Sequence, residues 1–304
     1  MHRNEILHVK NISQYYDISG LGKPRHPLVA IYSFSEIPKI DIQEPIRFTL
    51  GLYVVTIKRE CNFKSQYGQT SYDYDEGVMG FTAPNQVFKA DEDFYFPEQG
   101  WCLIFHPDFL LNYELARKIR QYHFFDYAVS EALILSEDEE RDIVDLFQKI
   151  KQEIDRPIDK FSQDVLIAQL DLLLTYSNRF YNRQFITRKP LNNHLLSRFE
   201  NLLEAFFSEE NRHLEGLPTV SYFASKLNIS SKYFSDMLKQ LTGLTAQQHI
   251  HEKLIEKAKE KLSATNLSVS EIAYELGFEH PQSFSKLFKT KTNVSPLEFR
   301  QSFN

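Results

Sequence analysis

The chain has 304 residues, which is enough for about two domains with substantial cores. Its content of 42% apolar and 25% charged residues is typical of a soluble protein, and no run of apolar residues is long enough to cross a membrane. The sequence has 2 cysteines, Cys61 and Cys102, so neither a disulfide framework nor a zinc knuckle is expected. Polar residues follow Met1 in place of a secretory signal, and we therefore expect a cytoplasmic protein.

The charge is distributed unevenly along the chain. The formal net charge is −6, which by itself argues against a polyanionic partner. Residues 216–304, however, contain 11 lysines and arginines against 8 acidic residues, a net charge of +3, and the remainder has a net charge of −9. This segregation is expected if one end of the chain binds nucleic acid and the other does not.

Residues 1–135 contain short apolar and alternating runs, and we expect a β domain there. Turn-forming segments separate the runs. The predicted strands are Pro27–Phe34, Phe48–Ile57 and Trp101–Phe105, and the turn segments are Gly20–Gly22, Asp73–Gly77 and Pro84–Asn85.

The same region is rich in aromatic side chains. Such residues line pockets for small apolar or sugar-like ligands, but they equally fill an ordinary β core. The pattern therefore leaves open whether an effector binds, and it identifies no effector-binding residue. The aromatic residues are Tyr15, Tyr16, Tyr32, Phe48, Tyr53, Phe63, Tyr67, Tyr72, Tyr74, Phe81, Phe88 and Trp101.

Residues 136–181 are predicted to form a helical hairpin that packs on the β domain. Ser136 and Glu139 have the spacing of a capping box, and Pro157 ends the first helix. The second helix begins near Asp159, and its wide apolar surface suits either dimerisation or packing within the chain.

A polar and basic stretch at residues 182–192 is the predicted interdomain linker. The basic side chains of this stretch, together with Arg179 just before it, are expected to be solvated, with phosphate contact as the alternative. Within the stretch they are Arg183, Arg188 and Lys189. An amphipathic helix from His194 to Phe207 then begins a C-terminal domain, residues 193–304.

The C-terminal domain contains one sequence pattern twice, beginning at Val220 and again at Val269. Two copies are too few for a solenoid and predict a pair of similar small modules. The matched residues are Val220, Ser221, Ala224 and Leu227 with Val269, Ser270, Ala273 and Leu276, and Phe234, Ser235, Lys239 and Thr242 with Phe284, Ser285, Lys289 and Thr292.

Each copy predicts a helix, a tight turn and a second helix. Apolar residues spaced at i, i+3, i+4 and i+7 define the first helix, and Thr219 can cap it in copy one. Asn228 and Gly277 occupy the two turns, where both residue types tolerate a left-handed backbone. The apolar faces of the second helices are formed by Phe234, Met237, Leu238 and Leu241 in copy one and by Phe284, Leu287 and Phe288 in copy two.

Further helices begin at capping boxes. These boxes are Thr245–Gln248, Ser268–Glu271 and Ser295–Glu298, and a long helix over about 246–262 joins the copies. In a helix-turn-helix, one helix braces against the DNA backbone while the other lies in the major groove. The doubled pattern favours this interpretation over a helical bundle without a ligand.

The sequence of this C-terminal domain resembles the AraC/XylS family of bacterial transcription regulators. The resemblance covers about the last hundred residues. It lies in the doubled motif, the run Val269–Phe278, the segment Ser283–Lys289 and the segment Ser295–Arg300. It implies an α+β chain in which a C-terminal all-α domain has two helix-turn-helix motifs. It also implies an N-terminal cupin-like β-barrel sensor and a helical hairpin that forms a homodimer contact.

The segment Glu76–Phe88 resembles the strand pair of a small cupin-type barrel. Metal-dependent cupins have a His-x-His pair, and the histidines before residue 130 include none. The only such pair, His249 and His251, lies on a predicted helix, where positions i and i+2 face different directions. We therefore expect no metal, no cofactor, no catalytic residue and no enzyme activity.

Exposed positions on the second helix of each copy are the predicted DNA contacts. Glutamine can bind adenine bidentately, lysine can reach guanine or phosphate, and serine suits either base or backbone. The alternative is that these positions form solvated polar faces. The predicted DNA-binding residues are Ser231, Lys232, Ser235, Asp236 and Lys239 in copy one and Gln282, Ser283, Ser285, Lys286 and Lys289 in copy two.

We interpret the sequence as an effector-responsive, sequence-specific regulator that binds double-stranded DNA, with RNA polymerase as a further candidate partner. Copy two is expected to supply more of the affinity, because Asp236 places an acid on the reading helix of copy one. One alternative is a regulator whose barrel only dimerises. A second is a cupin-type enzyme with an appended DNA module, against which the missing metal ligands argue.

Overall fold

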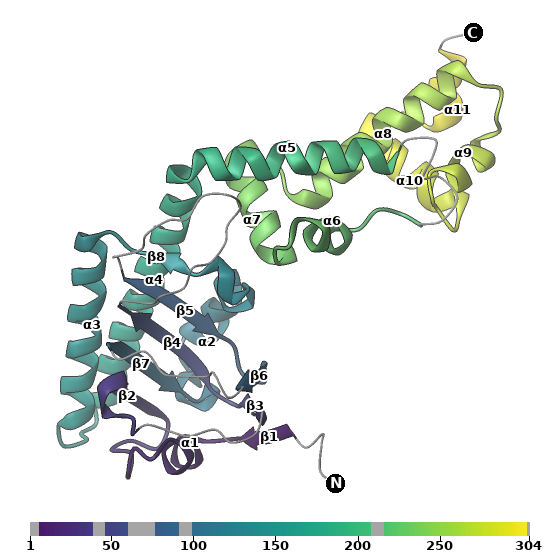
Figure 1. Ribbon diagram of the computed structural model, residues 1–304. Helices are drawn as coiled ribbons and strands as arrows, with labels where there is room; N and C mark the ends of the chain where they lie inside the picture. The colour runs from purple at the N-terminus through teal and green to yellow at the C-terminus, as the bar shows by residue number, and fades with distance from the viewer. Residues whose placement is uncertain (1–5, 39–45, 60–76, 91–98, 208–215, 303–304) are drawn as a thin grey trace. The chain divides into compact units, whose positions relative to one another are not determined.

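A computed structural model describes residues 6–38, 46–59, 77–90, 99–207 and 216–302 (Figure 1). Contacts between Cα atoms divide the chain into two compact units, Met1–Gln184 and Phe185–Asn304. Each unit is described by itself. Within the described residues, no helix is both long and apolar enough to cross a membrane.

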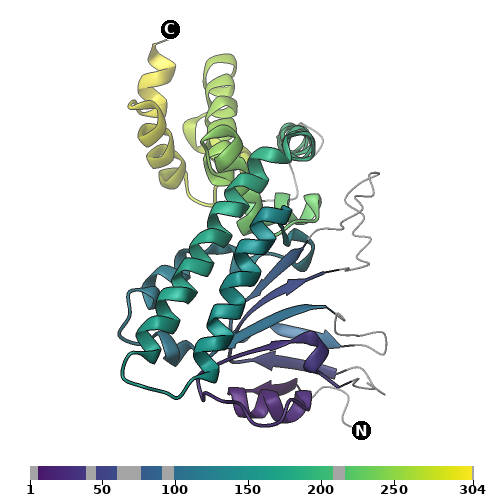
Figure 2. The ribbon, with the colours of Figure 1, turned by 90° about the vertical axis from the view of Figure 1, so that its left-hand side faces the viewer.

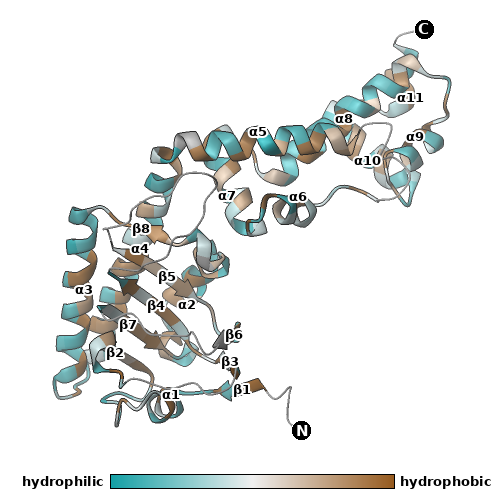
Figure 3. Ribbon diagram, in the orientation of Figure 1, coloured by the Kyte–Doolittle hydropathy of each residue, from teal (hydrophilic) through white to brown (hydrophobic). Residues whose placement is uncertain are grey.

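The strands of the N-terminal unit form two sheets. The larger sheet is antiparallel, in the order β2 (Val29–Ser33), β7 (Gly100–Phe105), β4 (Tyr53–Lys58), β5 (Val78–Thr82) and β8 (Leu133–Ile134). In the smaller sheet, β3 (Ile46–Leu50) lies between β1 (Ile6–Val9), which is parallel to it, and β6 (Val87–Ala90), which is antiparallel. The strands are largely apolar, as their brown colour in Figure 3 shows.

The predicted cupin-like barrel is not confirmed, because the described strands do not close into a barrel. Each sheet ends in two edge strands, and no ladder between described residues joins one sheet to the other. The predicted strand Phe48–Ile57 is in fact two strands of different sheets. It breaks at Gly51, whose amide donates to the Val9 carbonyl at 2.7 Å, and at Leu52, which is fully buried.

The expected strand pair at Glu76–Phe88 is also divided between the sheets. Strand β5 belongs to the larger sheet and β6 to the smaller one, with a turn between them in which Asn85 has a φ of 67°. The predicted strands Pro27–Phe34 and Trp101–Phe105 are confirmed as β2 and β7.

Short helices connect these strands and complete the unit's core. The packing is dense around Tyr32, against whose ring Tyr16 and Phe34 pack edge-on. The short elements are α1 (Ile12–Ser19), η1 (Phe34–Glu36), η2 (Pro107–Leu110), α2 (Leu115–Lys118), η3 (Ile119–Gln121), η4 (His123–Asp126) and η5 (Val129–Glu131).

The predicted helical hairpin consists of α3 (Glu137–Asp155) and α4 (Ser162–Thr187), which run side by side along the sheets (Figure 2). Ser136 and Glu139 form the expected capping box, since the Glu139 carboxylate accepts from the Ser136 amide at 2.9 Å. The first helix is amphipathic, which buries Ile143, Phe147 and Ile150.

The boundary between the two units lies between Gln184 and Phe185, inside the predicted linker of residues 182–192. Most of these residues are helical, which the prediction of a solvated linker did not anticipate. Helix α4 continues to Thr187, and α5 (Lys189–Phe206) begins two residues later. Arg183 helps to hold this segment in place, because its guanidinium binds the Glu139 carboxylate and donates to the Ile134 carbonyl at 2.8 Å.

Gln184 also anchors this part of α4. Its amide accepts from the Ile134 amide at 2.8 Å and donates to the Ala132 carbonyl at 3.2 Å. At the start of the second unit, the Asn192 side chain donates to the Phe185 carbonyl at 2.7 Å. Polar contacts that are buried or partly buried, most of them with residues distant in sequence, therefore hold a segment whose composition suggests solvent exposure.

The second unit consists of helices. Its elements after α5 are α6 (Val220–Leu227), α7 (Ser231–Thr242), α8 (Ala246–Ala264), α9 (Val269–Glu275), α10 (Pro281–Thr292) and α11 (Pro296–Gln301). Helices α5, α6 and α7 pack around Phe199, whose ring centroid lies 5.3 Å from that of Phe223 and 4.9 Å from that of Phe234. Helices α9, α10 and α11 pack around Phe284 and Phe288, and α8 contacts both groups. The sequence repeat is thus a structural repeat.

Candidate nucleic-acid interface

The first helix-turn-helix is α6–turn–α7, and local contacts define its ends. The Thr219 hydroxyl accepts from the Tyr222 amide at 3.1 Å and caps α6. The turn residue Asn228 has a φ of 58°, as its residue type predicts. The Ser230 hydroxyl then caps α7 by accepting from the Tyr233 amide at 3.2 Å.

The second helix-turn-helix is α9–turn–α10. Ser268 and Glu271 form the predicted capping box at the start of α9, and Gly277 in the turn has a φ of 90°. Helix α10 begins at Pro281, a residue suited to the first helical position because it has no amide hydrogen to satisfy. The N-cap residue His280 makes no side-chain capping bond.

The buried faces of α7 and α10 agree closely with the prediction. Phe234, Met237 and Leu238 are fully buried, as are Phe284 and Phe288. The other predicted inward residues, Leu241 and Leu287, are half-buried. The sequence interpretation missed Tyr233, which is buried with its ring centroid 5.1 Å from that of Phe185.

The predicted contacts on α7 divide into two groups. Lys232 and Lys239 are exposed. Ser231, Ser235 and Asp236 are half-buried, so less of each side chain is available to a ligand.

On α10 the predicted contacts form a more open surface. Gln282, Ser283, Lys286 and Lys289 are all exposed, and only Ser285 is half-buried. Gln282 and Ser283 lie in the first turn of the helix, the part of a recognition helix that reaches base edges.

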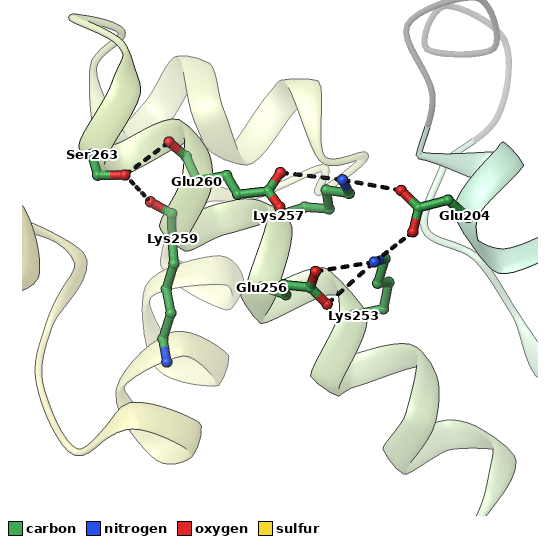
Figure 4. A network of polar contacts seen from close by, with 7 residues as sticks. All are labelled: Glu204, Lys253, Glu256, Lys257, Lys259, Glu260 and Ser263. Carbon is green, nitrogen blue, oxygen red and sulfur yellow. Dashed lines mark hydrogen bonds and ion pairs between the residues drawn. The ribbon is translucent and has the colours of Figure 1, made fainter. Parts of the chain in front are cut away.

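Three of the four lysines of α8 bind carboxylates within the protein. Glu204 on α5 receives Lys253 Nζ at 2.5 Å and Lys257 Nζ at 3.2 Å, as Figure 4 shows. Hydrogen bonds from Lys253 and then Lys257 hold the pKa of the Glu204 carboxyl below its usual range. The same lysines also pair along α8 with Glu256 at 3.1 Å and with Glu260 at 3.2 Å.

A further pair joins α8 to the second helix-turn-helix. Lys261 forms an ion pair with Glu275 on α9. The fourth lysine of this helix, Lys259, is exposed, and its Nζ lies 5.8 Å from the ring centroid of Phe299. Three of the four lysines therefore stabilise the packing of α8 against its neighbours.

The lysines of the two second helices differ from those of α8. They are all exposed and form no ion pair with any residue that the structure describes: Lys232, Lys239, Lys286, Lys289 and Lys291. These lysines thus divide into a neutralised set on α8, formed by Lys253, Lys257 and Lys261, and an open set on α7 and α10.

The histidine pair on α8 is accounted for by packing. The His249 Nε2 atom lies 2.8 Å from the Thr242 hydroxyl, and its ring packs edge-on against Phe199. Burial, and then Lys291, lowers the pKa of His251. Among the described residues, no three His, Cys, Asp or Glu side chains are grouped as metal ligands.

Several of the predicted aromatic pocket candidates of the N-terminal unit pack against other aromatic rings. Tyr15 hydrogen bonds to Tyr32, and Tyr53 stacks on Phe105 with 5.0 Å between ring centroids. Phe81 is buried against the aromatic residues of η4. The residues predicted as aromatic pocket candidates at Phe63, Tyr67, Tyr72 and Tyr74 lie outside the described residues.

Comparison with known proteins finds a matching domain family and similar proteins. Residues 223–302 match the helix-turn-helix domain family. The chain is 31% identical over 161 residues to the HTH-type transcriptional activator RhaS of Escherichia coli strain SMS-3-5, an alignment that covers 53% of each protein. The chain therefore spans about half the length of the curated relatives it matches.

Two solved structures are also similar. The C-terminal domain of AraT, a response regulator from Geobacillus stearothermophilus, is 30% identical and covers 36% of this chain and 84% of its own, with a TM-score of 0.32. The structure of ToxT from Vibrio cholerae O395 is 11% identical and covers 91% of this chain and 97% of its own, with a TM-score of 0.30.

Proposed function

We propose that this chain is a member of the AraC/XylS family of transcription regulators, that it binds double-stranded DNA sequence-specifically through α7 and α10, and that it regulates transcription from the site it occupies. This role places the protein in the cytoplasm. It requires no catalytic residue and no cofactor.

The division of the lysines is the observation that carries this proposal. On α8, three of the four lysines bind carboxylates of the same unit, whereas the lysines of α7 and α10 form no ion pair with a described residue. The exposed lysines of α7 and α10 lie on the helix that enters the major groove in a helix-turn-helix. Phosphates of DNA are the partner that fits such a surface.

Base recognition is assigned mainly to the first turn of α10. The Gln282 amide can form two hydrogen bonds with adenine, and the neighbouring Ser283 hydroxyl can contact base or phosphate. Lys286, one turn further along, can reach guanine or phosphate. All three side chains are exposed.

The first module has a different balance of positive and negative charge on its second helix, α7. Lys232 and Lys239 supply charge, whereas Asp236 between them is repelled by phosphate and is suited to accept from the amino group of cytosine. We infer that α10 supplies more of the affinity and α7 more of the discrimination. Helix α8 contacts both modules and would hold the two reading helices about one turn of DNA apart, roughly 34 Å.

The sequence preference of a Gln282→Ala variant tests this assignment. Duplexes are selected from a random pool by the wild type and by the variant, and the enriched motifs are compared. Loss of the bidentate contact predicts that one adenine position becomes degenerate while the rest of the motif persists. Gln247→Ala is the matched control, because Gln247 is an exposed glutamine on α8. Identical motifs for the wild type and the Gln282 variant would contradict the assignment.

Dimerisation is proposed through an exposed apolar seam that begins at the residue before α4 and continues along the helix. The seam comprises Phe161, Val165, Ala168 and Leu172, which are all exposed and follow one another at intervals of four, three and four residues. This spacing is that of a coiled-coil seam, and a second copy of the same helix is the partner that fits it. A homodimer would present two pairs of reading helices to DNA.

Sedimentation of the full chain tests the seam. Leu172→Glu places a charge in the middle of the seam and should convert the dimer to a monomer at micromolar concentration. Gln152→Glu, at an exposed position on α3, should leave the dimer intact. A monomeric wild type, or a dimer that survives the Leu172 change, would exclude this interface.

The N-terminal unit is proposed to respond to an effector. In this mechanism, a small molecule binds this unit and changes which arrangement of domains or protomers is populated, and so which DNA half-sites are occupied. The alternative is a unit that only dimerises. Thermal unfolding with a panel of metabolites separates the two, since a ligand of the native state must raise the unfolding temperature by mass action.

A further inference from the structure

The two repeats exchange asparagine and glycine at their left-handed positions. In the turn between helices, repeat one has Asn228 with a φ of 58° and repeat two has Gly277 with a φ of 90°. After the second helix the order is reversed, with Gly243 at a φ of 80° and Asn293 at 65°. Each position therefore accepts asparagine in one repeat, so the left-handed backbone alone does not explain the choice of glycine.

The surroundings of the two glycines differ. A Cβ atom added to Gly243 would have no atom within 4 Å. A Cβ atom added to Gly277 would lie 2.8 Å from the Gly216 carbonyl carbon and 3.0 Å from the Leu217 nitrogen. These are backbone atoms, which cannot rotate out of the way as a flexible side chain can. Gly277 thus occupies a position where only glycine fits the observed packing.

The contact at Gly277 joins the two helix-turn-helix modules. Gly216 and Leu217 lie three and two residues before Thr219, the N-cap of α6 in the first module. Gly277 lies in the turn of the second module. Helix α8 is one connection between the modules, and this close approach of two backbones is a second. Two separate connections restrict the rotation of one module against the other more than a single helix does.

We propose that Gly277 is a positioning residue. Because it lacks a side chain, the segment before α6 can close against the second turn, and this contact fixes the orientation of α7 relative to α10. The inference rests on the proposed function, since that orientation matters for binding only if both helices read one duplex.

Two matched substitutions separate packing from backbone conformation. Gly277→Asn introduces the residue type that repeat one has at the same position of the turn, Asn228, but it adds a side chain against Gly216. Gly243→Asn makes the same chemical change at a similar φ in open space. Gly216→Ala is a second control, because its Cβ would lie 4.0 Å from the Gly277 carbonyl oxygen, an ordinary contact.

The first test measures DNA binding by the full chain. The probes are a duplex selected by the wild type, with both sequence blocks, and duplexes with either block alone. We expect Gly277→Asn to weaken binding to the two-block duplex at least about tenfold, which is the effect of losing one well-placed base contact. Binding to single blocks should be unchanged, and both controls should bind like the wild type. Wild-type binding by the Gly277 variant, or equal losses on single blocks, would overturn the inference.

The second test needs no DNA. Spin labels at Lys232→Cys and Lys286→Cys, in a Cys61→Ser background, report the separation of α7 and α10, while Cys102 is buried and should remain unlabelled. The distance distribution should shift or broaden with Gly277→Asn and stay unchanged with Gly243→Asn. If no duplex is ever selected but this shift occurs, the proposed function fails and the packing role stands. An unchanged distribution refutes the packing role.

Alanine variants cover the case in which the asparagine variant does not fold. Gly277→Ala adds the same Cβ atom and nothing more, and Gly243→Ala supplies the same backbone penalty without the contact. A change in the distance distribution with the first and not with the second supports the inference. Equal behaviour of the two contradicts it.

Discussion

Removing lysines from α10 should change the salt dependence of DNA binding, whereas removing lysines from α8 should not. The α10 pair is Lys286 and Lys289, which are exposed and form no ion pair with a described residue. The α8 pair is Lys253 and Lys257, which both bind Glu204. The two double alanine variants remove the same formal charge from the same unit.

The expected magnitude follows from counterion release. Each phosphate contact contributes about 0.9 to the slope of log K against log salt concentration, so loss of two contacts should reduce the slope by about 1.8. The α8 variant removes no phosphate contact and should retain the wild-type slope. Its cost should instead be a small loss of stability, about 1 kcal/mol or less per pair, because Glu204 is 57% exposed.

Fluorescence anisotropy of a labelled duplex, titrated with protein at four or more salt concentrations, gives the three slopes. Equal slopes for the α10 variant and the wild type would show that these lysines do not contact phosphate. A reduced slope for the α8 variant would show that the ion pairs with Glu204 open on DNA, and the division of lysines into neutralised and open sets would be wrong.

Three further outcomes are expected. Lys286→Ala should weaken DNA binding more than Lys232→Ala does, and the reverse order in titrations would contradict the larger share of affinity assigned to α10. Phe199→Ala removes a fully buried ring that packs between α5, α6 and α7. It should lower the free energy of unfolding, measured with denaturant, by about 3–5 kcal/mol. A loss below about 1 kcal/mol would show that α5 is not part of this core. Burial raises the pKa of the Cys102 thiol from 9.0 to about 12. The stabilisation that the protonated thiol contributes is therefore present below pH 9 and is lost as the pH rises toward 12. The difference in unfolding temperature between the wild type and Cys102→Ala should change between pH 9 and 12 and stay constant below pH 9.

Local signals explain why the second unit could be predicted from sequence. A capping box depends on residues three apart, as with Ser268 and Glu271, and a left-handed turn depends on one residue, as with Asn228. The internal repeat then indicated which two helices belong to each helix-turn-helix module. Tyr233 was missed because its burial depends on Phe185, which lies far away in sequence.

Non-local contacts explain the errors in the first unit. The run from Phe48 to Ile57 has the composition of one strand, and only the bond from Gly51 to Val9 shows where the chain passes to the other sheet. Arg183 lies in a polar, basic stretch that is typical of a solvated linker. Its ion pair with Glu139 on α3 shows why this part of the chain is instead held against the first unit. Strand order and long-range ion pairs are set by tertiary packing, which no short window of sequence contains.

Composition also could not separate the lysines that bind carboxylates from those left open. Lys257 and Lys286 both lie on polar faces of helices in a basic region. The partner of Lys257 is Glu204 on another helix, so the distinction requires the packed structure. The position of Gly277 is similar, because its residue type predicts the turn but not the approach of Gly216.

Selection of duplexes from a random pool by the purified full chain tests the central claim most directly. The account predicts one enriched motif with two sequence blocks about ten base pairs apart, centre to centre, because two reading helices would lie on one face of the duplex. Weak binding that falls steeply with salt and enriches no motif would mean attraction to phosphate alone, and it would contradict sequence-specific reading by α7 and α10.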